Sequence, residues 1–292
     1  MSLFRYPGGK TKLVGKIIDK LTEMSDGMKE FDYREPFFGA GAIGFKFLEK
    51  HHEGPAWIND YDPSIYCIWI NVKNYSHELK SKIKKFKITP ESFYENKRFL
   101  KGYAANIEEF RKTIKEEGVA FSLDVALRKI AIHQTSFSGL GTRAGSPIGG
   151  REQLGKYKVN CRYNVASMTK NVDKLHNVLK RDNEVRVTCR DYSDLVEKPG
   201  KCLIYLDPPY FDQGQNLYEH GFSLEQHKRL AELLRATDQP WVLSYDDDKA
   251  GEVRKLYDWA DVGVIENVNT IKVRPGVKKA TRVHELLITS PR

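Results

Sequence analysis

The sequence of 292 residues contains no run of about 18 apolar residues, the length that a helix needs to cross a bilayer. The segment from Met1 to Lys20 is interrupted by charged side chains, so the apolar part of a secretory signal is also missing. The interrupting residues are Arg5, Lys10, Lys12 and Lys16. These absences argue against a membrane protein and predict a cytoplasmic one that needs no membrane partner.

Cysteine is scarce, and its four copies are far apart in the sequence, at Cys67, Cys161, Cys189 and Cys202. No C-x-x-C pair is present, which argues against a zinc knuckle and against a framework of disulfides. We therefore predict reduced cysteines and no metal site. Hydrophobic residues make up 40% of the chain and aromatic residues 11%, which excludes disorder of the whole chain.

Basic residues are concentrated in the middle of the chain. The formal net charge is +9, and residues 61–170 alone contain 20 Lys and Arg against 10 Asp and Glu. Between Leu127 and Lys170 only Glu152 opposes a series of cations: Arg128, Lys129, Arg143, Arg151, Lys156, Lys158, Arg162 and Lys170. Such a segment would attract a polyanion, although a solvated basic surface would have the same composition.

The flanks of the chain alternate between strand and helix patterns. Four short apolar runs have the length of strands, with helical periodicity between them: Ala56–Asn59, Val185–Cys189, Cys202–Leu206 and Trp241–Tyr245. This alternation predicts an α/β fold with a mostly parallel sheet covered on both faces. Ser223 and Gln226 have the spacing of a capping box and predict a helix start. Near the end of the chain, Val262–Val273 and Arg282–Thr289 predict a hairpin.

The middle segment breaks this alternation. Residues from Ser76 to Glu117 predict exposed helices, and Leu123–Thr135 has the periodicity of a helix that faces a core. The next stretch, Ser136–Gly155, contains six glycines and predicts a long loop, which in a compact domain is usually functional or disordered. A basic insertion therefore separates the two α/β halves.

Two glycine-rich segments suggest ligand binding. Gly39 to Gly44 fits G-x-G-x-x-G and is followed by Asp60 at the end of the next predicted strand, an arrangement typical of nucleotide sites. The charged residues Arg34 and Glu35 precede it where a dinucleotide fold has an apolar strand, which weighs against NAD. A tight turn without a ligand remains the simpler alternative. Gly8-Gly9-Lys10-Thr11 does not have the spacing of a phosphate-binding P-loop, but backbone amides and Lys10 could hold an anionic or polar group there at the start of a helix. A helix entry with a surface lysine is the simpler alternative.

A third motif, Asp207-Pro208-Pro209-Tyr210, directly follows the apolar run Cys202–Leu206. It therefore lies at the carboxyl end of a buried strand, where open α/β sheets bind their ligands. The two prolines restrict the backbone and remove two N–H donors, so the motif presents carbonyl oxygens, a carboxylate and an aromatic ring. This combination suits a flat ring with an exocyclic amino group.

Several motifs occur here in the order found in Dam-like DNA adenine-N6 methyltransferases, and the chain resembles that family over both α/β halves. The motifs are Phe4 to Lys10, Glu35 to Gly41, Asn59-Asp60, Asp207 to Tyr210 and Phe222 to His227. Dam-like enzymes that read GATC carry an Asn-Val-Pro segment where this chain has Ser146-Pro147-Ile148. The recognised DNA sequence therefore stays open, with GATC as one alternative.

The resemblance implies a Rossmann-like methyltransferase sheet with an inserted, mainly helical target-recognition domain. Residues 1–62 and 171–292 would form the discontinuous catalytic domain, and residues 63–170 the DNA-binding insertion. It also implies S-adenosylmethionine as cofactor, double-stranded DNA as partner and no metal. The implied cofactor residues are Tyr6, Lys10, Phe38, Gly39, Ala40, Gly41, Asp60 on the ribose, Asp191 near the adenine, Tyr192 and Asp207.

By the same resemblance, Asp207, Pro208, Pro209 and Tyr210 would take a target adenine that is flipped out of the duplex. The DNA-binding cations would be those of the insertion: Arg128, Lys129, Arg143, Arg151, Lys156, Lys158 and Arg162. Three alternatives stay open: a cytosine-N4 enzyme, an RNA amino methyltransferase and an inactive DNA-binding protein on the same fold. The sequence is compatible with a monomer or a weak dimer in a bacterial or phage setting, and a cognate restriction endonuclease would not be physically required.

Overall fold

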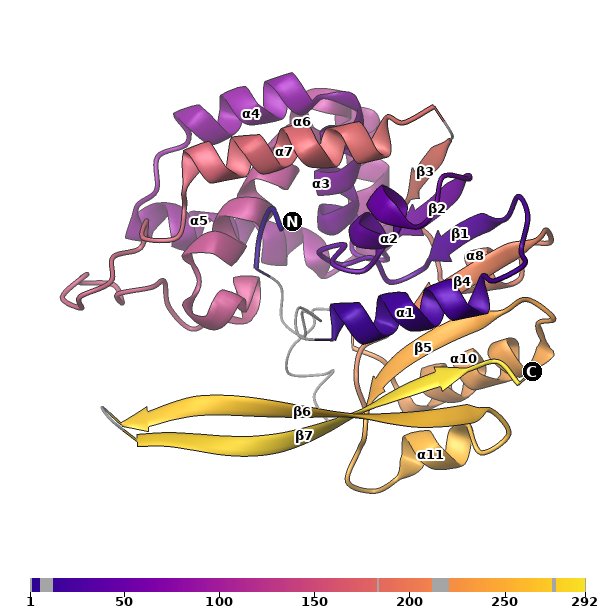
Figure 1. Cartoon of the computed structure of the whole chain (residues 1–292). Helices are drawn as coiled ribbons and strands as arrows, with labels where there is room; N and C mark the ends of the chain where they lie inside the picture. Colours follow the sequence, from indigo (N-terminus) through magenta and orange to yellow (C-terminus); the bar gives the residue numbers. More distant parts are fainter. Residues whose placement is uncertain (1, 6–12, 183, 212–220, 275–276, 292) are drawn as a thin grey trace.

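The computed structural model describes residues 2–5, 13–182, 184–211, 221–274 and 277–291; at 138, 266–274 and 277–283 it describes the backbone alone. Its centre is a seven-stranded sheet of order β3-β2-β1-β4-β5-β7-β6, parallel except for β7 and β6 (Figure 1). The strands are β1 (Asp32–Glu35), β2 (Ala56–Asn59), β3 (Val185–Thr188), β4 (Cys202–Leu206), β5 (Trp241–Asp246), β6 (Asp261–Arg274) and β7 (Val277–Thr289).

The predicted strands are confirmed, to within one residue, by β2, β3, β4 and β5, and the predicted hairpin by β6 and β7. Helix α10 (Leu224–Ala236) begins as expected, because Ser223 and Gln226 exchange both hydrogen bonds of the capping box. The turn of the predicted hairpin, Pro275-Gly276, lies outside the described residues. Apolar runs and capping residues were therefore sufficient to locate these elements.

Strand β1 lacks the apolar run that the sequence patterns of the other parallel strands show. It consists of Asp32, Tyr33, Arg34 and Glu35, yet it pairs with both β2 and β4 in the middle of the sheet. Arg34 and Glu35 are each 2% exposed. The Arg34 guanidinium pairs with Asp32 and donates to the carbonyl oxygens of Leu195 and Lys198. These tertiary partners compensate the buried charge, so a strand forms without an apolar run.

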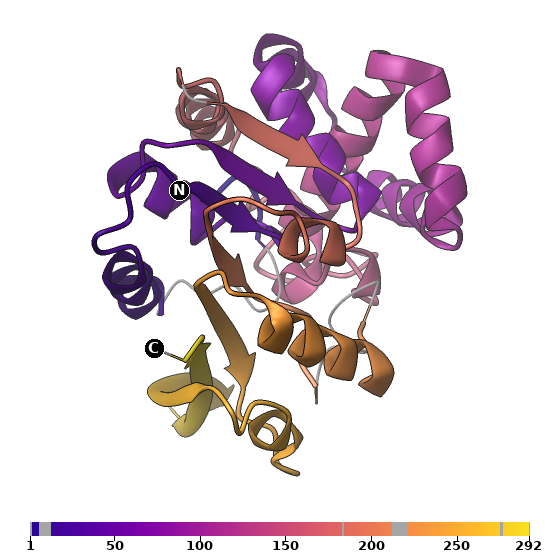
Figure 2. The same ribbon diagram turned by 90° about the vertical axis from the view of Figure 1, so that its right-hand side faces the viewer.

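Helices cover both faces of the sheet (Figure 2). The side chains of β4 alternate: Leu203 and Tyr205 join one hydrophobic cluster, whereas Cys202, Ile204 and Leu206 join the other. The helices α1 (Val14–Met24), α2 (Gly44–Lys50) and α7 (Val165–Leu179) lie on the first side, and α8 (Ser193–Val196), α10 and α11 (Glu252–Leu256) on the second. Burial on both faces explains the continuous apolar runs of the parallel strands.

The middle of the chain forms α3 (Pro63–Asn74), α4 (Ser76–Lys85), α5 (Pro90–Ala104) and α6 (Ile107–Thr135). Gly118, with φ of 71°, interrupts α6. The helices expected to be exposed nevertheless bury Leu79 and Phe93 completely. Their core is continuous with the core on one face of the sheet, so these helices pack directly on the α/β body.

The predicted glycine-rich loop is present after α6 and contains two short 3-10 turns, Phe137–Gly139 and Gly141–Arg143. The buried His133 ring bonds to the Gly139 carbonyl at 2.9 Å, and burial lowers the His133 pKa to about 3. A side chain at Gly141 (φ of 59°) would meet this ring at 2.7 Å. A neutral histidine therefore anchors the start of the loop, and glycine is required beside it.

Candidate active site

A pocket opens at the carboxyl ends of β1, β2, β3 and β4. Its walls come from four loops of the α/β body and from the first turn of α10: Pro36, Phe37, Gly39, Asp60, Tyr61, Asp62, Asp191, Tyr192, Asp207, Pro209, Gly221, Phe222 and Gln226. Because parallel strands end at the same edge of the sheet, residues far apart in the sequence meet there.

The buried side chain of Asn59 holds three of these strand ends together. Its amide nitrogen donates to the carbonyl oxygens of Pro36, at 3.1 Å, and Arg190, at 3.0 Å. Its oxygen accepts from the Arg190 backbone and the Thr188 hydroxyl, both at 2.8 Å. A single amide thus links the ends of β1, β2 and β3 at the floor of the pocket.

The glycine turn after β1 allows the backbone to reach the pocket. Gly39 and Gly41 have φ angles of 48° and 67°. A side chain at Gly41 would meet the rings of Phe45 and Phe38 at 2.5 and 2.6 Å. The Gly39 N–H donates to the Asp60 carboxylate at 2.7 Å. The turn and the end of β2 are therefore joined as one unit, and the missing side chain at Gly41 makes room for the rings of Phe38 and Phe45.

Asp60 is the acidic group of this unit. The carboxylate oxygen that does not bond to Gly39 accepts a hydrogen bond from the Asp62 N–H at 3.0 Å. Burial, followed by the negative charge of Asp62, raises the Asp60 pKa to about 7, although hydrogen bonds from both backbone N–H groups and the charge of Lys129 act in the opposite direction. A ligand that donates hydrogen bonds to Asp60 would favour its ionised form.

Glu35 lies buried beneath the pocket and was not among the site residues expected from the sequence. Its carboxyl group accepts from the Tyr33 hydroxyl at 2.7 Å. Burial raises its pKa well above the ordinary value, and the nearby charges of Asp207 and Asp60 add to the shift. A side chain at Gly44 would come within 2.2 Å of this carboxyl group. The third glycine of the motif therefore makes room for Glu35.

An aromatic cluster borders the other side of the pocket. The rings of Phe37, Tyr192 and Phe222 have centroids 5.4 to 5.6 Å apart. Asp191 lies beside them after β3 and accepts hydrogen bonds from both the backbone and the hydroxyl of Ser193. Arg229 lies 3.7 Å from the same carboxylate. The wall thus combines flat apolar faces with a carboxylate at their edge.

The Asp207-Pro208-Pro209-Tyr210 loop follows β4 and forms the wall nearest the centre of the sheet. The Ser244 hydroxyl, on β5, donates to the Asp207 carboxylate at 3.3 Å and lies 2.9 Å from the Tyr205 hydroxyl. The Tyr210 hydroxyl donates to Glu285 of β7 at 2.5 Å. Neighbouring strands therefore orient the side chains of both Asp207 and Tyr210.

The structure gathers only some of the expected cofactor residues around the pocket. Gly39, Asp60, Asp191, Tyr192 and Asp207 line it, and Ala40 and Gly41 belong to its turn. Phe38 is an exception: it is 3% exposed and packs on Phe45 and Trp69, while its neighbour Phe37 faces the pocket. Tyr6 and Lys10 lie outside the described residues. The run Phe37-Phe38 could have suggested this division, because consecutive residues of an extended segment point to opposite sides.

Lys129 was expected to face DNA, and the structure places it elsewhere. It is 3% exposed, and its ammonium group lies 2.8 Å from an Asp62 carboxylate oxygen. Lys129 belongs to the core-facing side of α6, so its charge stabilises the buried acid beside the pocket instead of the surface. Counting cations along the sequence could not reveal this, because the count ignores the direction in which each residue of a helix points.

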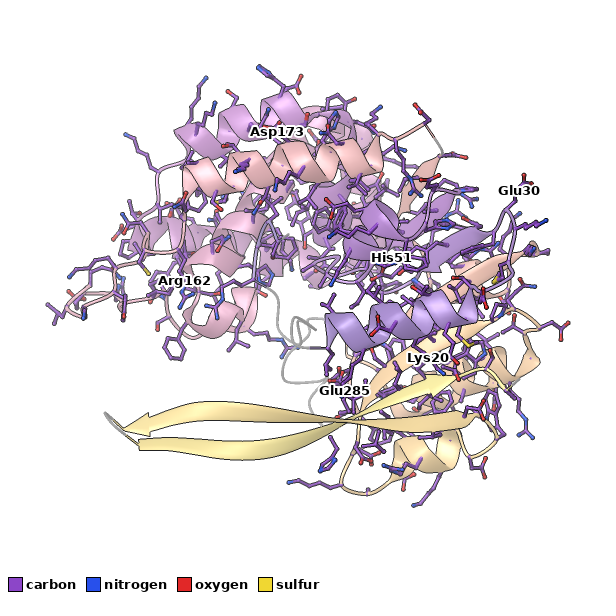
Figure 3. All side chains as sticks on the ribbon, viewed as in Figure 1. Lys20, Glu30, His51, Arg162, Asp173 and Glu285 are labelled. Carbon is purple, nitrogen blue, oxygen red and sulfur yellow. The ribbon has the colours of Figure 1, made fainter. Side chains whose placement is uncertain are left out.

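The other expected DNA-binding cations are at the surface to different degrees. Arg128 is partly buried, pairs with Asp124 at 2.7 Å and lies over the Phe99 ring. The remaining five are exposed: Arg143, Arg151, Lys156, Lys158 and Arg162. Figure 3 shows Arg162 on the side of the molecule opposite to Glu30. The exposed cations thus belong to the segment that runs from the glycine-rich loop to α7.

Membrane-spanning helices and metal clusters are both absent from the described residues. None of their helices has both the length and the apolar character needed to cross a bilayer. Nor does this part of the chain contain a group of three or more His, Cys, Asp or Glu side chains arranged to hold a metal ion.

Comparison with known proteins shows the family of this chain. The type II methyltransferase M.MjaIII of Methanocaldococcus jannaschii is 26% identical to this chain over 296 aligned positions, which cover 97% of this chain and 96% of that protein. The sequence pattern of the D12 class N6 adenine-specific DNA methyltransferases matches residues 6–271. Neither match separates a Dam-like subgroup, which stays a prediction. Because the pattern covers most of the sequence, including the glycine turn and the Asp207 loop, the chain belongs to the D12 class N6 adenine-specific DNA methyltransferase family.

Proposed function

We propose that S-adenosylmethionine binds in the pocket at the ends of β1, β2 and β3, and that the Asp207 loop holds the target adenine of duplex DNA. The adenine-specific DNA methyltransferase activity follows from the family. One observation carries the assignment of the two ligands: Asp207 lines the same pocket as Gly39 and Asp60. The site for the adenine and the site for the methyl donor would therefore be adjacent.

The residues of the pocket fit S-adenosylmethionine by their chemistry. Asp60 can accept hydrogen bonds from the two ribose hydroxyls, and the rings of Phe37 and Tyr192 can pack on the adenine. Asp191 can accept from the adenine amino group. Of the four carboxylates of the wall, Asp62 pairs with Lys129, and the other three, on Asp60, Asp191 and Asp207, suit a ligand that carries a positive charge. The absence of a side chain at Gly39, which lines the pocket, permits close approach of the ligand to the backbone.

The Asp207 loop supplies the chemistry at the adenine. The amino nitrogen of adenine is a poor nucleophile because its lone pair is delocalised into the ring. The Asp207 carboxylate and the Pro208 carbonyl can each accept a hydrogen bond from this amino group. These two hydrogen bonds orient the lone pair and stabilise the positive charge that develops on the nitrogen. Tyr210, held by Glu285, can stack on the flipped base. Bound S-adenosylmethionine supplies an electrophilic methyl group.

The affinity for S-adenosylmethionine is expected to rise as the pH increases through about 7. In the free protein the Asp60 pKa is raised from its ordinary value to about 7, so the carboxyl group holds its proton at a pH at which an exposed aspartate has lost it. Since the ionised form is the stronger acceptor for the ribose hydroxyls, affinity should fall by up to about tenfold for each pH unit below 6. Calorimetric titrations between pH 5.5 and 8.5 measure this.

The matched control is Asp60→Asn, which keeps one oxygen acceptor but cannot ionise. We expect weaker binding in this variant, by roughly 1.5 to 3 kcal/mol, and a flat pH profile across the same range. An unchanged affinity, or a pH dependence equal to that of the parent, would place the ribose elsewhere.

We further propose that residues 63–170 recognise the DNA target, while residues 1–62 and 171–292 form the catalytic domain. Five exposed cations lie in the stretch from Arg143 to Arg162. Lys97 donates to the Ala144 carbonyl at 2.6 Å, which fixes the base of the loop that carries Arg143. Arg151 lies over the Tyr94 ring of α5. The exposed cations are therefore displayed from a supported loop.

Replacing Lys156 and Lys158 with alanine is expected to weaken the binding of every duplex. Each lost phosphate contact should reduce the slope of log affinity against log salt by about 0.9. Arg143→Ala should instead relax the preference at one base pair, at a cost of about 1 to 3 kcal/mol for the preferred sequence. Fluorescence titrations over a range of salt concentrations separate the two effects. If both variants bind like the parent at every salt concentration, this segment is only a solvated surface.

A further inference from the structure

The strands β6 and β7 continue well beyond the sheet. β7 pairs with β5 only from Glu285 to Thr289, whereas its pairing with β6 extends to Arg274 and Val277. Residues 266–274 and 277–284 thus form a two-stranded ribbon with no third strand. At about 3.3 Å per residue, the nine residues of β6 in this ribbon span about 30 Å. Figure 1 shows the ribbon, in yellow, projecting from the body of the protein.

The ribbon is strongly basic. Residues 266–283 contain five cations, Lys272, Arg274, Lys278, Lys279 and Arg282, against the single acid Glu266. When this ribbon and the basic segment 61–170 are set aside, the rest of the chain carries 23 Lys and Arg against 28 Asp and Glu. The whole excess of positive charge therefore belongs to two segments that are far apart in the sequence.

The strand register places like charges together on the ribbon. Lys272 is directly opposite Lys278, and Arg282 occupies the same face as both, because positions two and four residues apart along a strand share a face. Directly opposed like charges destabilise a two-stranded pair, and an isolated ribbon is at best marginally stable in water. An anionic partner along this face would remove that repulsion.

The ribbon also has a defined relation to the active site. Glu285, which directly follows the ribbon in β7, accepts the hydrogen bond from Tyr210 at 2.5 Å. The free end of the ribbon projects toward the same side of the molecule as Arg162 of the basic segment, as Figures 1 and 3 show. The two basic segments therefore extend in one direction from the body that carries the pocket.

We propose that the β6–β7 ribbon is a second DNA-binding arm, separate from the basic segment 61–170, and that it contacts the phosphates of the substrate duplex. This rests on the proposed function. A length of about 30 Å is close to one turn of B-form DNA, and a two-stranded ribbon has a width that DNA grooves accommodate. Phosphate contacts carry no sequence information, so the ribbon holds the duplex in place and leaves recognition to the other segment. Through Glu285 and Tyr210, DNA bound to the ribbon is linked to the catalytic loop.

The test removes the three cations that share one face, as Lys272→Ala, Lys278→Ala and Arg282→Ala in one full-length variant. The matched control removes three exposed lysines elsewhere, as Lys29→Ala, Lys50→Ala and Lys198→Ala, with the same change in net charge. Affinity for a 40-base-pair duplex of random sequence is measured over a range of salt concentrations. In the ribbon variant, the slope of log affinity against log salt should decrease in magnitude by about 0.9 for each broken phosphate contact, so by up to about 2.7 for three. The control should keep the slope of the parent.

Two more measurements distinguish lost phosphate contacts from a damaged fold. The Lys272→Arg and Lys278→Arg double variant should keep the parent slope, and the affinity of the ribbon variant for S-adenosylmethionine should equal that of the parent. Equal slopes for ribbon variant and control would overturn the inference and leave the methyltransferase function standing. A change in oligomeric state with unchanged DNA affinity would also overturn it, since the charges would then only protect an exposed strand edge. If the parent itself neither binds nor methylates duplex DNA, the proposed function fails first.

Discussion

Replacing Asp207 with alanine is expected to lower kcat for methyl transfer by about 10²- to 10³-fold. The carboxylate would accept a hydrogen from the adenine amino group, and this interaction strengthens as positive charge develops on the nitrogen, so its loss acts mainly on the transition state. The measurement is the rate at which N6-methyladenine appears in digested DNA under single-turnover conditions. Dissociation constants for S-adenosylmethionine and for duplex DNA should change by less than the rate.

The Ser244→Ala variant tests the same role of Asp207 with a smaller expected effect. Its hydroxyl contacts Asp207 at 3.3 Å without lining the pocket, so we expect a smaller fall in kcat with unchanged affinity for both ligands. Near-normal turnover of the Asp207→Ala variant would refute the role of the loop. Formation of N4-methylcytosine by the parent would refute the proposed substrate.

Replacing Lys129 with alanine is expected to destabilise the protein by about 3 to 5 kcal/mol. The substitution leaves the buried carboxylate of Asp62 without the ammonium group that lies 2.8 Å away, and an uncompensated buried charge is costly. It also removes a positive charge that holds down the Asp60 pKa, so binding of S-adenosylmethionine near pH 7 should weaken as well. The free energy of unfolding is measured from denaturant titrations.

Lys156→Ala, an exposed lysine of the same segment, is the matched control and should change the unfolding free energy by no more than about 0.5 kcal/mol. Addition of Asp62→Asn to the Lys129→Ala variant should restore part of the stability, because asparagine is neutral and keeps the oxygen that caps α3. If the Lys129→Ala variant instead lost DNA affinity while its unfolding free energy stayed unchanged, Lys129 would be a DNA-binding residue after all.

Local patterns were sufficient for the parts of the fold that depend on short-range chemistry. The apolar runs of β2, β4 and β5 determine buried strands because both faces of a parallel sheet are covered. Ser223 and Gln226 determine the start of α10, since the capping box joins residues three positions apart. The order of the glycine turn, Asp60 and the Asp207 motif predicted a site at the strand ends, and the pocket lies there.

Other features depended on partners that are distant in the sequence, and only the tertiary structure decided them. The charged strand β1 can be buried because the carbonyl oxygens of Leu195 and Lys198 accept hydrogen bonds from Arg34. Lys129 is buried because its ammonium group pairs with the Asp62 carboxylate. Phe37 and not Phe38 faces the pocket, and the link between Tyr210 and Glu285 joins positions 75 residues apart. The sequence by itself determined which chemical groups are available, whereas long-range contacts decided which of them are buried, paired or exposed.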